Sequence, residues 1–230
     1  MGNTIGEQVA RNLRIPRKGL IGAYVTRSIR KKNAFLEENA VRLCDIQPHH
    51  RVLEVGFGPG VGLAAALQQV KDGPGVIYGA EISTYMVEKA TRKFRRAIQS
   101  GRLDISLANV AQLPYQSFFF DCVYHCNCFY FWPRLDVACA ELLRVLKPGA
   151  LMVTTMNIDS LKVAASKGQM KYANTDPLRY MAGLENVGFE QVRIEYLEDR
   201  DKRYQAIFAH KPQDSHEPTE TVDIGNKDDT

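Results

Sequence analysis

The sequence predicts an α/β protein built on a doubly wound, mostly parallel sheet of seven strands, with a helical cap before the sheet and an antiparallel hairpin strand at its end. Three observations support this fold class. Short apolar segments alternate with helical ones between residues 51 and 156, which is typical of a parallel sheet covered by helices. A glycine-rich turn follows the first of these strands. Near the end, two strands flank a polar turn, which indicates a hairpin.

The N-terminal region is expected to be helical as far as about Cys44, with a break marked by Pro16, Gly19 and Gly22. Asn33 is the type of residue that caps helices, so a helix is expected to begin there. The apolar residues after it recur at helical spacing, namely Phe35, Leu36, Ala40, Val41 and Leu43.

The alternating region is expected to hold five strands: Arg51–Val55, Gly75–Ala80, Leu103–Ala108, Phe120–Tyr124 and Leu151–Met156. Its helices are expected at Val61–Val70, Met86–Ala97 and Leu135–Leu146, the last of them stopped by Pro148 and Gly149. A helix at Pro177–Val187 follows, and the hairpin pairs Gln191–Tyr196 with Tyr204–His210 across the turn Asp199–Arg203. We therefore expect a helical cap over residues 1–50, a ligand-binding domain over 51–211 and a disordered tail over 212–230.

The 230 residues, 45% of them hydrophobic, suit one domain with a buried core. No apolar run reaches the roughly 18 residues that a membrane span needs, and the N-terminus lacks the pattern of a secretory signal. The five cysteines are odd in number and unevenly spaced, which argues against a disulfide framework. These features favour a cytoplasmic protein with reduced thiols.

Charge is distributed unevenly along the chain. Residues 11–32 contain eight Lys or Arg and no acid, whereas the segment from Pro212 onward contains six acids and one Lys. The basic segment is either a solvated helix face or a contact for an anionic substrate, with peripheral membrane contact left open. Nucleic-acid binding is disfavoured because no recognised nucleic-acid-binding motif accompanies the charge.

The glycine-rich turn contains Gly56, Gly58 and Gly60 between a strand and a helix, where the backbone can approach a ligand closely. Glu54 lies inside the preceding strand, where a carboxylate needs a partner such as a ligand ammonium group. Glu81 ends the next strand, where a carboxylate can accept the hydroxyls of a ribose. The spacing does not match G-x-G-x-x-G, because Val61 or Leu63 occupies the third glycine position. A ligand with a ribose and no pyrophosphate fits better than a dinucleotide.

Five segments in order resemble the motifs of the class I S-adenosylmethionine-dependent methyltransferases, in particular their type 11 domain. They are Val52–Gly60, Gly79–Ser83 with Met86, Asn109–Tyr115, Phe120–Val123 and Glu141–Gly149. The resemblance covers about Arg51 to Met156 and implies a Rossmann-like fold. It identifies S-adenosyl-L-methionine as the expected cofactor.

The resemblance also implies which residues contact that cofactor. Its methionine moiety would lie against Glu54 and the backbone of Gly56, Phe57 and Gly58, beside Gly60. Its ribose would bind Glu81, and its adenine would lie against four further residues: Ile82, Met86, Asn109 and Val110. The family usually has Asp where this chain has Asn109, but an amide oxygen can also accept a hydrogen bond from the adenine amino group. The mouth of the site near the sulfonium would include Asn127.

The residues after the fourth strand, with the N-terminal segment, are the candidates for the acceptor side. His125 and Tyr130 are the candidate catalytic residues if the acceptor must lose a proton, although a buried, hydrogen-bonded histidine is the stronger interpretation of His125. Tyr24, Tyr130 and Trp132 are expected to line the acceptor site. A zinc site at His125, Cys126 and Cys128 is disfavoured because no second ligand pair exists, so no metal is expected.

The favoured function is therefore in-line transfer of a methyl group to a small-molecule acceptor by a cytoplasmic methyltransferase. The alternative is a catalytically silent S-adenosylmethionine-binding regulator or scaffold. A related aminopropyl transferase is disfavoured because residues 124–132 contain no acid. The identity of the acceptor and the oligomeric state stay open.

Overall fold

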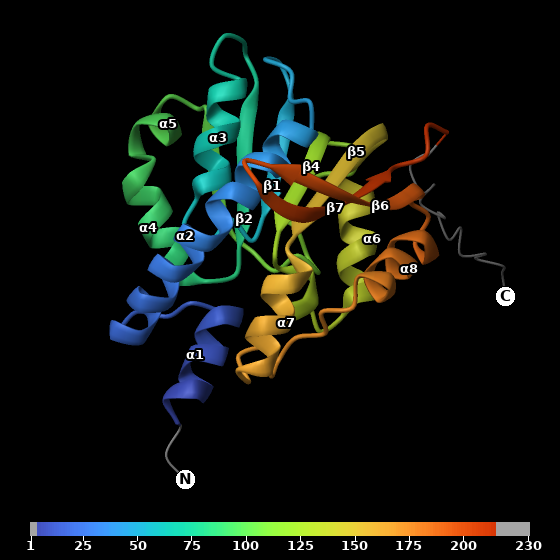
Figure 1. The fold of residues 1–230 in the computed structure, drawn as a ribbon. Helices are drawn as coiled ribbons and strands as arrows, with labels where there is room; N and C mark the ends of the chain where they lie inside the picture. The colour runs from blue at the N-terminus through green and yellow to red at the C-terminus, as the bar shows by residue number, and fades with distance from the viewer. Residues whose placement is uncertain (1–3, 215–230) are drawn as a thin grey trace, which may run out of the picture.

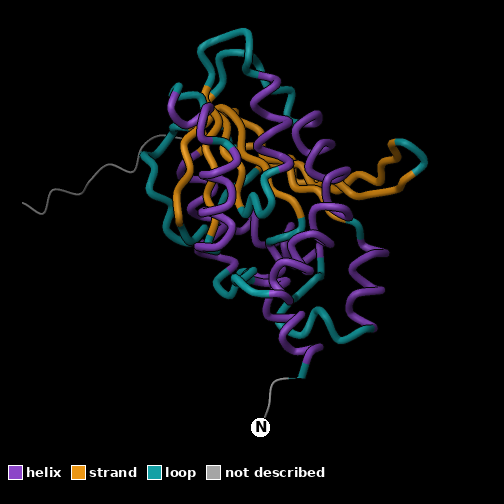
Figure 2. Tube along the Cα trace, turned by 90° about the vertical axis from the view of Figure 1, so that its left-hand side faces the viewer, coloured by secondary structure: helices purple, strands orange, loops and turns teal. Residues whose placement is uncertain are grey.

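The computed structural model describes residues 4–214, which form one mixed sheet flanked by helices (Figures 1 and 2). The strand order is β3-β2-β1-β4-β5-β7-β6. Neighbours among β1 to β5 are parallel, whereas β7 is antiparallel to both β5 and β6. The predicted sheet, seven strands with an antiparallel C-terminal hairpin strand, is confirmed. Its strands are β1 (Arg51–Val55), β2 (Val76–Glu81), β3 (Leu103–Leu107), β4 (Phe120–Cys126), β5 (Leu146–Met156), β6 (Glu190–Asp199) and β7 (Lys202–His210).

Helices cover both faces of the sheet, and each face has its own apolar core. One core joins the sheet to α6 (Leu135–Val145) and α8 (Pro177–Asn186). The other joins it to α2 (Leu20–Leu43), α3 (Val61–Gln69) and α4 (Thr84–Lys93). The central strands are buried on both faces, which explains why they read as continuous apolar runs. The remaining helices are α1 (Ile5–Arg14), α5 (Arg95–Gln99), α7 (Ile158–Ser166) and the 3-10 turn η1 (Phe129–Phe131).

The predicted helix start at Asn33 is wrong. Helix α2 runs without interruption from Leu20, so Asn33 lies in its middle. The Asn33 side chain does not cap the helix; its Oδ1 accepts a hydrogen bond from Asn127 Nδ2 at 3.2 Å. The break at Pro16 and Gly19 is confirmed as the connection between α1 and α2, but Gly22 lies inside α2. A Cβ on Gly22 would overlap the Arg17 carbonyl, so the glycine permits close packing of this connection.

Other boundaries also differ from the expectation. Strand β5 begins at Leu146 and not at Leu151, so helix α6 ends at Val145 and Pro148 and Gly149 lie inside the strand. The hairpin turn is shorter than the predicted Asp199–Arg203, because β6 extends to Asp199 and β7 begins at Lys202. The helix expected at Met86–Ala97 is divided into α4 and α5 at Phe94. Strand β4 continues two residues past Tyr124, because its pairing with β5 extends to Cys126. Helix α7, which was not predicted, follows β5 and is capped by the Asn157 side chain, whose Oδ1 accepts the Ser160 N–H. Residues 215–230, most of the expected disordered tail, lie outside the described residues.

Candidate cofactor and acceptor site

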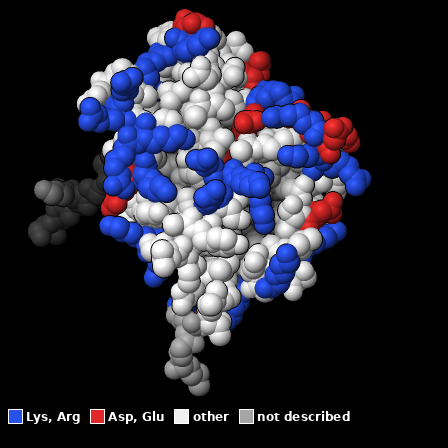
Figure 3. All heavy atoms as spheres, turned by 60° about the vertical axis from the view of Figure 1, so that its left-hand side comes forward, with Lys and Arg blue, Asp and Glu red and all other residues white. Residues whose placement is uncertain are grey.

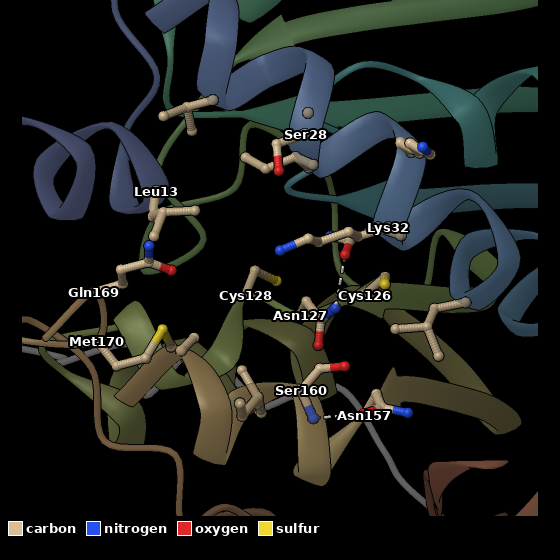
Figure 4. Close-up of a pocket in the computed structure, with 18 of the residues that line it drawn as sticks. Leu13, Ser28, Lys32, Cys126, Asn127, Cys128, Asn157, Ser160, Gln169 and Met170 are labelled. Atoms are coloured by element: carbon tan, nitrogen blue, oxygen red, sulfur yellow. Dashed lines mark hydrogen bonds between the residues drawn. The ribbon is translucent and has the colours of Figure 1, made fainter. Parts of the chain in front are cut away.

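A cavity of about 870 Å³ lies at the carboxyl ends of β1 and β4, the two strands at which the sheet order reverses. Ligands of open α/β sheets bind at this switch point, and the volume is in the range of small-molecule sites. The glycine loop and the ends of β2 and β4 line one side. Helices α1 and α2, the 3-10 turn η1, helix α7 with the segment after it, and the start of β7 line the rest. Figure 4 shows Lys32 of α2 on one side of the cavity, Ser160 and Met170 on the other, and Asn127 and Cys128 between them.

The glycine loop presents its backbone to this cavity. Gly56, Gly58 and Gly60 all have positive φ angles, of 68°, 47° and 68°, which side chains disfavour. A Cβ on Gly58 would meet only the Gly56 carbonyl oxygen, at 3.9 Å, so the space in front of Gly58 is open to a ligand. Phe57 points the other way: its ring is buried against Gly79, where a Cβ would stand 2.8 Å from it. The loop is thus anchored in the core by Phe57 and exposes backbone to the cavity at Gly56 and Gly58. Gly60, which was also expected at the cofactor, does not line the cavity, and a Cβ there would stand 2.8 Å from the Phe94 ring.

Glu81 ends β2 beside this loop and lines the cavity. Its Oε2 accepts the Gly58 N–H at 3.0 Å and its Oε1 accepts the Ser83 N–H at 2.8 Å. Burial raises the pKa of this carboxyl, and the two N–H groups oppose the rise. A carboxylate has about four acceptor positions, so both oxygens can accept further hydrogen bonds from a diol. This arrangement fits a ribose.

Glu54 lies behind the loop, 1% exposed and outside the cavity lining. The Tyr124 hydroxyl donates to its Oε2 at 3.0 Å. Gly62 makes room for this carboxyl, since a Cβ there would stand 2.7 Å from Glu54 Cδ. Burial, followed by the charge of Glu37, raises the pKa of Glu54 well above its usual range.

Glu37 is a site residue that the sequence analysis missed. It comes from α2, is 4% exposed and lines the cavity. Its Oε2 accepts the Gly62 N–H at 2.9 Å, at the N-terminus of α3. Burial raises its pKa to about 7. A signal was present, because Glu37 directly follows Phe35 and Leu36 in a segment of helical apolar periodicity.

Asn127 joins the end of β4 to the N-terminal cap. Its backbone has a φ of 50°, and its N–H donates to the Thr155 carbonyl at 3.1 Å. While its Nδ2 donates to Asn33, its buried Oδ1 has no hydrogen-bond partner among the described residues. Asn127 also lines the cavity, so a ligand donor group would satisfy this oxygen.

His125 is fully buried and does not line the cavity. Its Nε2 lies 2.7 Å from the Tyr180 hydroxyl and 2.8 Å from the Thr154 hydroxyl, and its Nδ1 lies 3.4 Å from the Cys128 thiol. Burial lowers the pKa of His125 to about 3, so the imidazole is neutral at physiological pH. The structure thus gives His125 the hydrogen-bonded position that the sequence analysis favoured over that of a base.

Tyr130 and Tyr24 line the cavity, whereas Trp132 does not. Tyr130 is buried, which raises the pKa of its hydroxyl well above the usual range. Tyr24, on α2, is 69% exposed and lies at the rim. The ring centroid of Trp132 lies 4.9 Å from that of His125, which is itself buried and outside the lining.

The four residues expected against the adenine do not line the cavity. Met86 and Val110 are buried in the cores, and Ile82 is exposed. The Asn109 Oδ1 accepts the Ala111 N–H at 3.0 Å, which closes a local turn. The α1–α2 connection lies against the loop after β2, where the Pro16 carbonyl accepts the Ser83 hydroxyl at 2.5 Å.

The rest of the cavity has a mixed lining of apolar and basic side chains, with the polar residues Ser28, Asn33, Asn157, Ser160 and Gln169 and the acid Asp159. The apolar residues come from α1, α2, η1, α7 and the segment after α7: Val9, Leu13, Val25, Ile29, Leu36, Phe131, Leu161, Val163, Ala164 and Met170. The basic residues are Lys31, Lys32, Lys167, Lys202 and Arg203. Within residues 4–214 none of these five forms an ion pair. Figure 3 shows Lys and Arg side chains prevailing on the face that carries α2 and α4.

No helix within residues 4–214 has the length and apolarity needed to cross a membrane. No group of three or more His, Cys, Asp or Glu side chains in the same range is arranged to hold a metal ion.

Comparison with known proteins shows that part of the chain matches one protein family. Residues 53–154 match the model of the methyltransferase domain family. The chain is 33% identical over 128 residues to the 24-methylenesterol C-methyltransferase 2 of Oryza sativa subsp. japonica, which covers 56% of this chain and 34% of that protein. This chain thus spans about a third of that relative's length.

A second relative matches over nearly its full length. The uncharacterized methyltransferase YdaC of Bacillus subtilis is 23% identical over 181 residues, which covers 79% of this chain and 94% of that protein. Among solved structures, geranyl diphosphate methyltransferase in complex with S-adenosylmethionine superimposes with a TM-score of 0.64 at 14% identity, covering 87% of this chain and 94% of that one. This last likeness shows a shared fold.

Proposed function

The chain carries a class I S-adenosylmethionine-dependent methyltransferase domain, and from this premise we propose that it transfers the cofactor's methyl group to an apolar small molecule that bears an anionic group. The observation that carries the proposal is that a single cavity contains a surface suited to the cofactor and a surface suited to the acceptor. The glycine loop and Glu81 line one side of it, and the rest of the lining includes ten apolar and five basic side chains beside a smaller number of polar ones.

The cofactor side is assigned from the contacts of the loops. The backbone at Gly56 and Gly58 lies against the methionine moiety, because the space in front of Gly58 is open. Glu81 binds the ribose through its two carboxylate oxygens. Asn127 offers its unpartnered Oδ1 to a donor of the bound ligands. The adenine contacts of Ile82, Met86, Asn109 and Val110 stay predictions, since none of these residues lines the cavity.

The acceptor side is assigned from its lining. Leu13 of α1, Val25 of α2 and Leu161 of α7 offer apolar surface to an apolar body. The five basic side chains of the lining form no ion pair within residues 4–214 and outnumber Asp159, so they attract an anion to the cavity. The methylenesterol named for the rice relative is also an apolar acceptor.

The chemistry requires little beyond orientation and exclusion of water. S-adenosylmethionine supplies a methyl group bonded to a positively charged sulfur. The acceptor atom attacks the methyl carbon in line, and the electron pair of the broken carbon–sulfur bond stays on sulfur. The apolar walls exclude water and hold the two reactants together, which accounts for most of the rate enhancement. Of the two candidate catalytic residues, only Tyr130 lines the cavity. Its raised pKa keeps the hydroxyl protonated, so it suits donation of a hydrogen bond to the acceptor better than removal of a proton from it.

The proposal is tested by following formation of S-adenosylhomocysteine from S-adenosylmethionine with pairs of acceptors. Each pair shares an isoprenoid or long-chain body, and one member has a carboxylate or phosphate where the other has a hydroxyl. We expect turnover of the anionic members. Lys167→Gln should raise KM for them, and Lys162→Gln, on the same helix but outside this lining, is the matched control.

The outcomes separate the parts of the proposal. Equal KM values for the charged and neutral members of a pair would contradict the proposal that the acceptor bears an anionic group. Tight cofactor binding without turnover of any acceptor would favour the alternative, a catalytically silent cofactor-binding protein. Absence of cofactor binding would refute the assignment of the cavity as a whole.

A further inference from the structure

A second buried carboxyl group lies beside Glu54 and comes from the N-terminal helix α2. We propose that this residue, Glu37, is the carboxylate that receives the α-ammonium group of the cofactor's methionine moiety, with Glu54 behind it as a support. The inference rests on the proposed function, because it assigns one group of the same cofactor to one residue.

The position of Glu37 relative to the cavity is the first argument. Glu37 and Glu54 approach Gly62 from two directions: the Gly62 N–H donates to Glu37 Oε2 at 2.9 Å, and the missing Cβ of Gly62 makes room for the Glu54 carboxyl. Only Glu37 lines the cavity. Glu54 is held from behind by the Tyr124 hydroxyl at 3.0 Å. A ligand in the cavity therefore meets Glu37 before Glu54.

The charge balance of this pair is the second argument. Among residues 4–214, no Lys, Arg or His nitrogen lies within 4.0 Å of a carboxylate oxygen of Glu37 or Glu54. The nearby Lys93 donates to the Gly60 carbonyl at 3.0 Å. Two buried carboxyls without a cation are unfavourable in the ionised form. An ammonium group in the cavity supplies the missing positive charge.

The protonation of the pair follows from its surroundings. Burial raises the pKa of Glu37 to about 7 and that of Glu54 well above its usual range. The groups that act on Glu37 are the Val61 and Gly62 N–H groups and Lys93, which lower its pKa, and Glu38, which raises it; Glu81 further raises the pKa of Glu54. The pair therefore holds protons near neutral pH, and an incoming ammonium favours their release.

One consequence concerns the N-terminal helices. If Glu37 binds the ammonium group, α2 supplies a cofactor ligand in addition to covering the site. The α-helical N-terminus at Val61 and Gly62 fixes the Glu37 carboxyl, so its position depends on the packing of α2 against α3.

The test compares two ligands by isothermal titration calorimetry. S-adenosylhomocysteine carries the α-ammonium group, whereas 5′-methylthioadenosine shares the adenosine and the thioether but lacks the amino-acid part. We expect Glu37→Gln to weaken the binding of S-adenosylhomocysteine by at least tenfold and to leave the affinity for 5′-methylthioadenosine within twofold of the wild-type value. The matched control is Glu38→Gln, because Glu38 is the next residue of α2 and its carboxylate pairs with Arg200 at 2.7 Å. This control should leave both affinities unchanged.

Proton release provides a second readout. Titrations at pH 7 in two buffers of different ionisation enthalpy should show that the wild-type protein releases protons when S-adenosylhomocysteine binds, and that Glu37→Gln releases fewer. Thermal melting of the variants checks that they are folded. If folded Glu37→Gln loses affinity for both ligands equally, or for neither of them, the proposed role of Glu37 is overturned. A wild-type protein that binds neither ligand would instead refute the proposed function.

Discussion

Gly58→Val offers the sharpest test of the cofactor site, because its effects on stability and on binding are separable. Gly58 has a φ of 47°, and the only atom near its absent Cβ is the Gly56 carbonyl oxygen at 3.9 Å. A valine side chain therefore overlaps no protein atom at its Cβ but occupies cavity space in front of the loop. The substitution should block the cofactor without disrupting the core.

The stability cost follows from the backbone conformation. A left-handed φ costs a residue with a Cβ about 1–2 kcal/mol relative to glycine, and β-branched valine lies at the upper end of this range. In a protein of this size such a loss lowers Tm by roughly 2–8 °C. It is small beside the total stability of about 5–15 kcal/mol that is usual for folded proteins, so the variant stays folded at 25 °C.

Gly101→Val is the matched control. Gly101 has a φ of 70° and no atom within 4 Å of its absent Cβ, so valine meets the same backbone strain there, but Gly101 is not among the cavity residues. Both variants should show similar shifts in urea or thermal unfolding. Calorimetry with S-adenosylhomocysteine should detect binding to Gly101→Val at wild-type affinity and none to Gly58→Val. Normal binding by Gly58→Val would refute the placement of the cofactor at the glycine loop.

Three further predictions follow from other contacts. Glu81→Ala removes a charged acceptor and should weaken binding of S-adenosylhomocysteine by about 1–3 kcal/mol in calorimetry; an unchanged affinity would contradict the ribose assignment. His125 has its pKa lowered from 6.5 to about 3, so the folded state favours its neutral form, and its contribution to stability is complete above pH 6.5 and is lost as the pH falls toward 3. The buried acids change the stability in the opposite sense, so the free energy of unfolding in urea should be compared between the wild type and His125→Gln at each pH. The difference between the two free energies should shrink by about 2 kcal/mol from pH 7.5 to pH 5. A constant difference would contradict a buried neutral histidine. Gly22→Ala places a Cβ on the Arg17 carbonyl and should accelerate limited proteolysis in the α1–α2 connection, whereas an unchanged cleavage rate would show that this packing is unimportant.

The sheet could be predicted from the sequence because its signals are local. Each central strand is buried on both faces and reads as an apolar run, and the turn between β6 and β7, at Arg200 and Asp201, lies within the polar segment that predicted the hairpin. The glycine loop was recognisable for the same reason, since a turn with positive φ angles requires residues that tolerate them. Glu81 was found because a polar residue at the end of an apolar strand stands out within a few positions of the chain.

The errors share a cause, which is that they depend on contacts between distant parts of the chain. Asn33 has the residue type of a cap, but its partner is Asn127, 94 positions away. Glu37 was missed because its carboxyl is fixed by Gly62, and an acid on a helix is most often solvated. Trp132, expected at the acceptor, packs against His125 instead. Local spacing indicates that Glu37 lies beside the apolar face of a helix, but it does not give the distant partner of any of these three residues.

The N-terminal helices are part of the site's architecture and not a separable lid. Leu36, Ala40 and Val41 of α2 are buried in the same core as α3 and α4, so removal of residues 1–50 would expose apolar surface that the rest of the chain cannot cover.

The same helices and the connection between them hydrogen-bond to three segments around the cavity, the loops after β2 and β4 and the start of α3 after the glycine loop. The Pro16 carbonyl accepts from Ser83 after β2, Glu37 accepts from Gly62 after β1, and Asn33 accepts from Asn127 after β4. A ligand that fixes any of these segments also favours the docked position of α1 and α2, and docking in turn favours the ligand, because the coupling of two equilibria is reciprocal. Cofactor binding should therefore protect the α1–α2 connection from proteolysis, and the loss of this protection in Glu37→Gln, but not in Glu38→Gln, would locate the coupling in the carboxylate that α2 contributes.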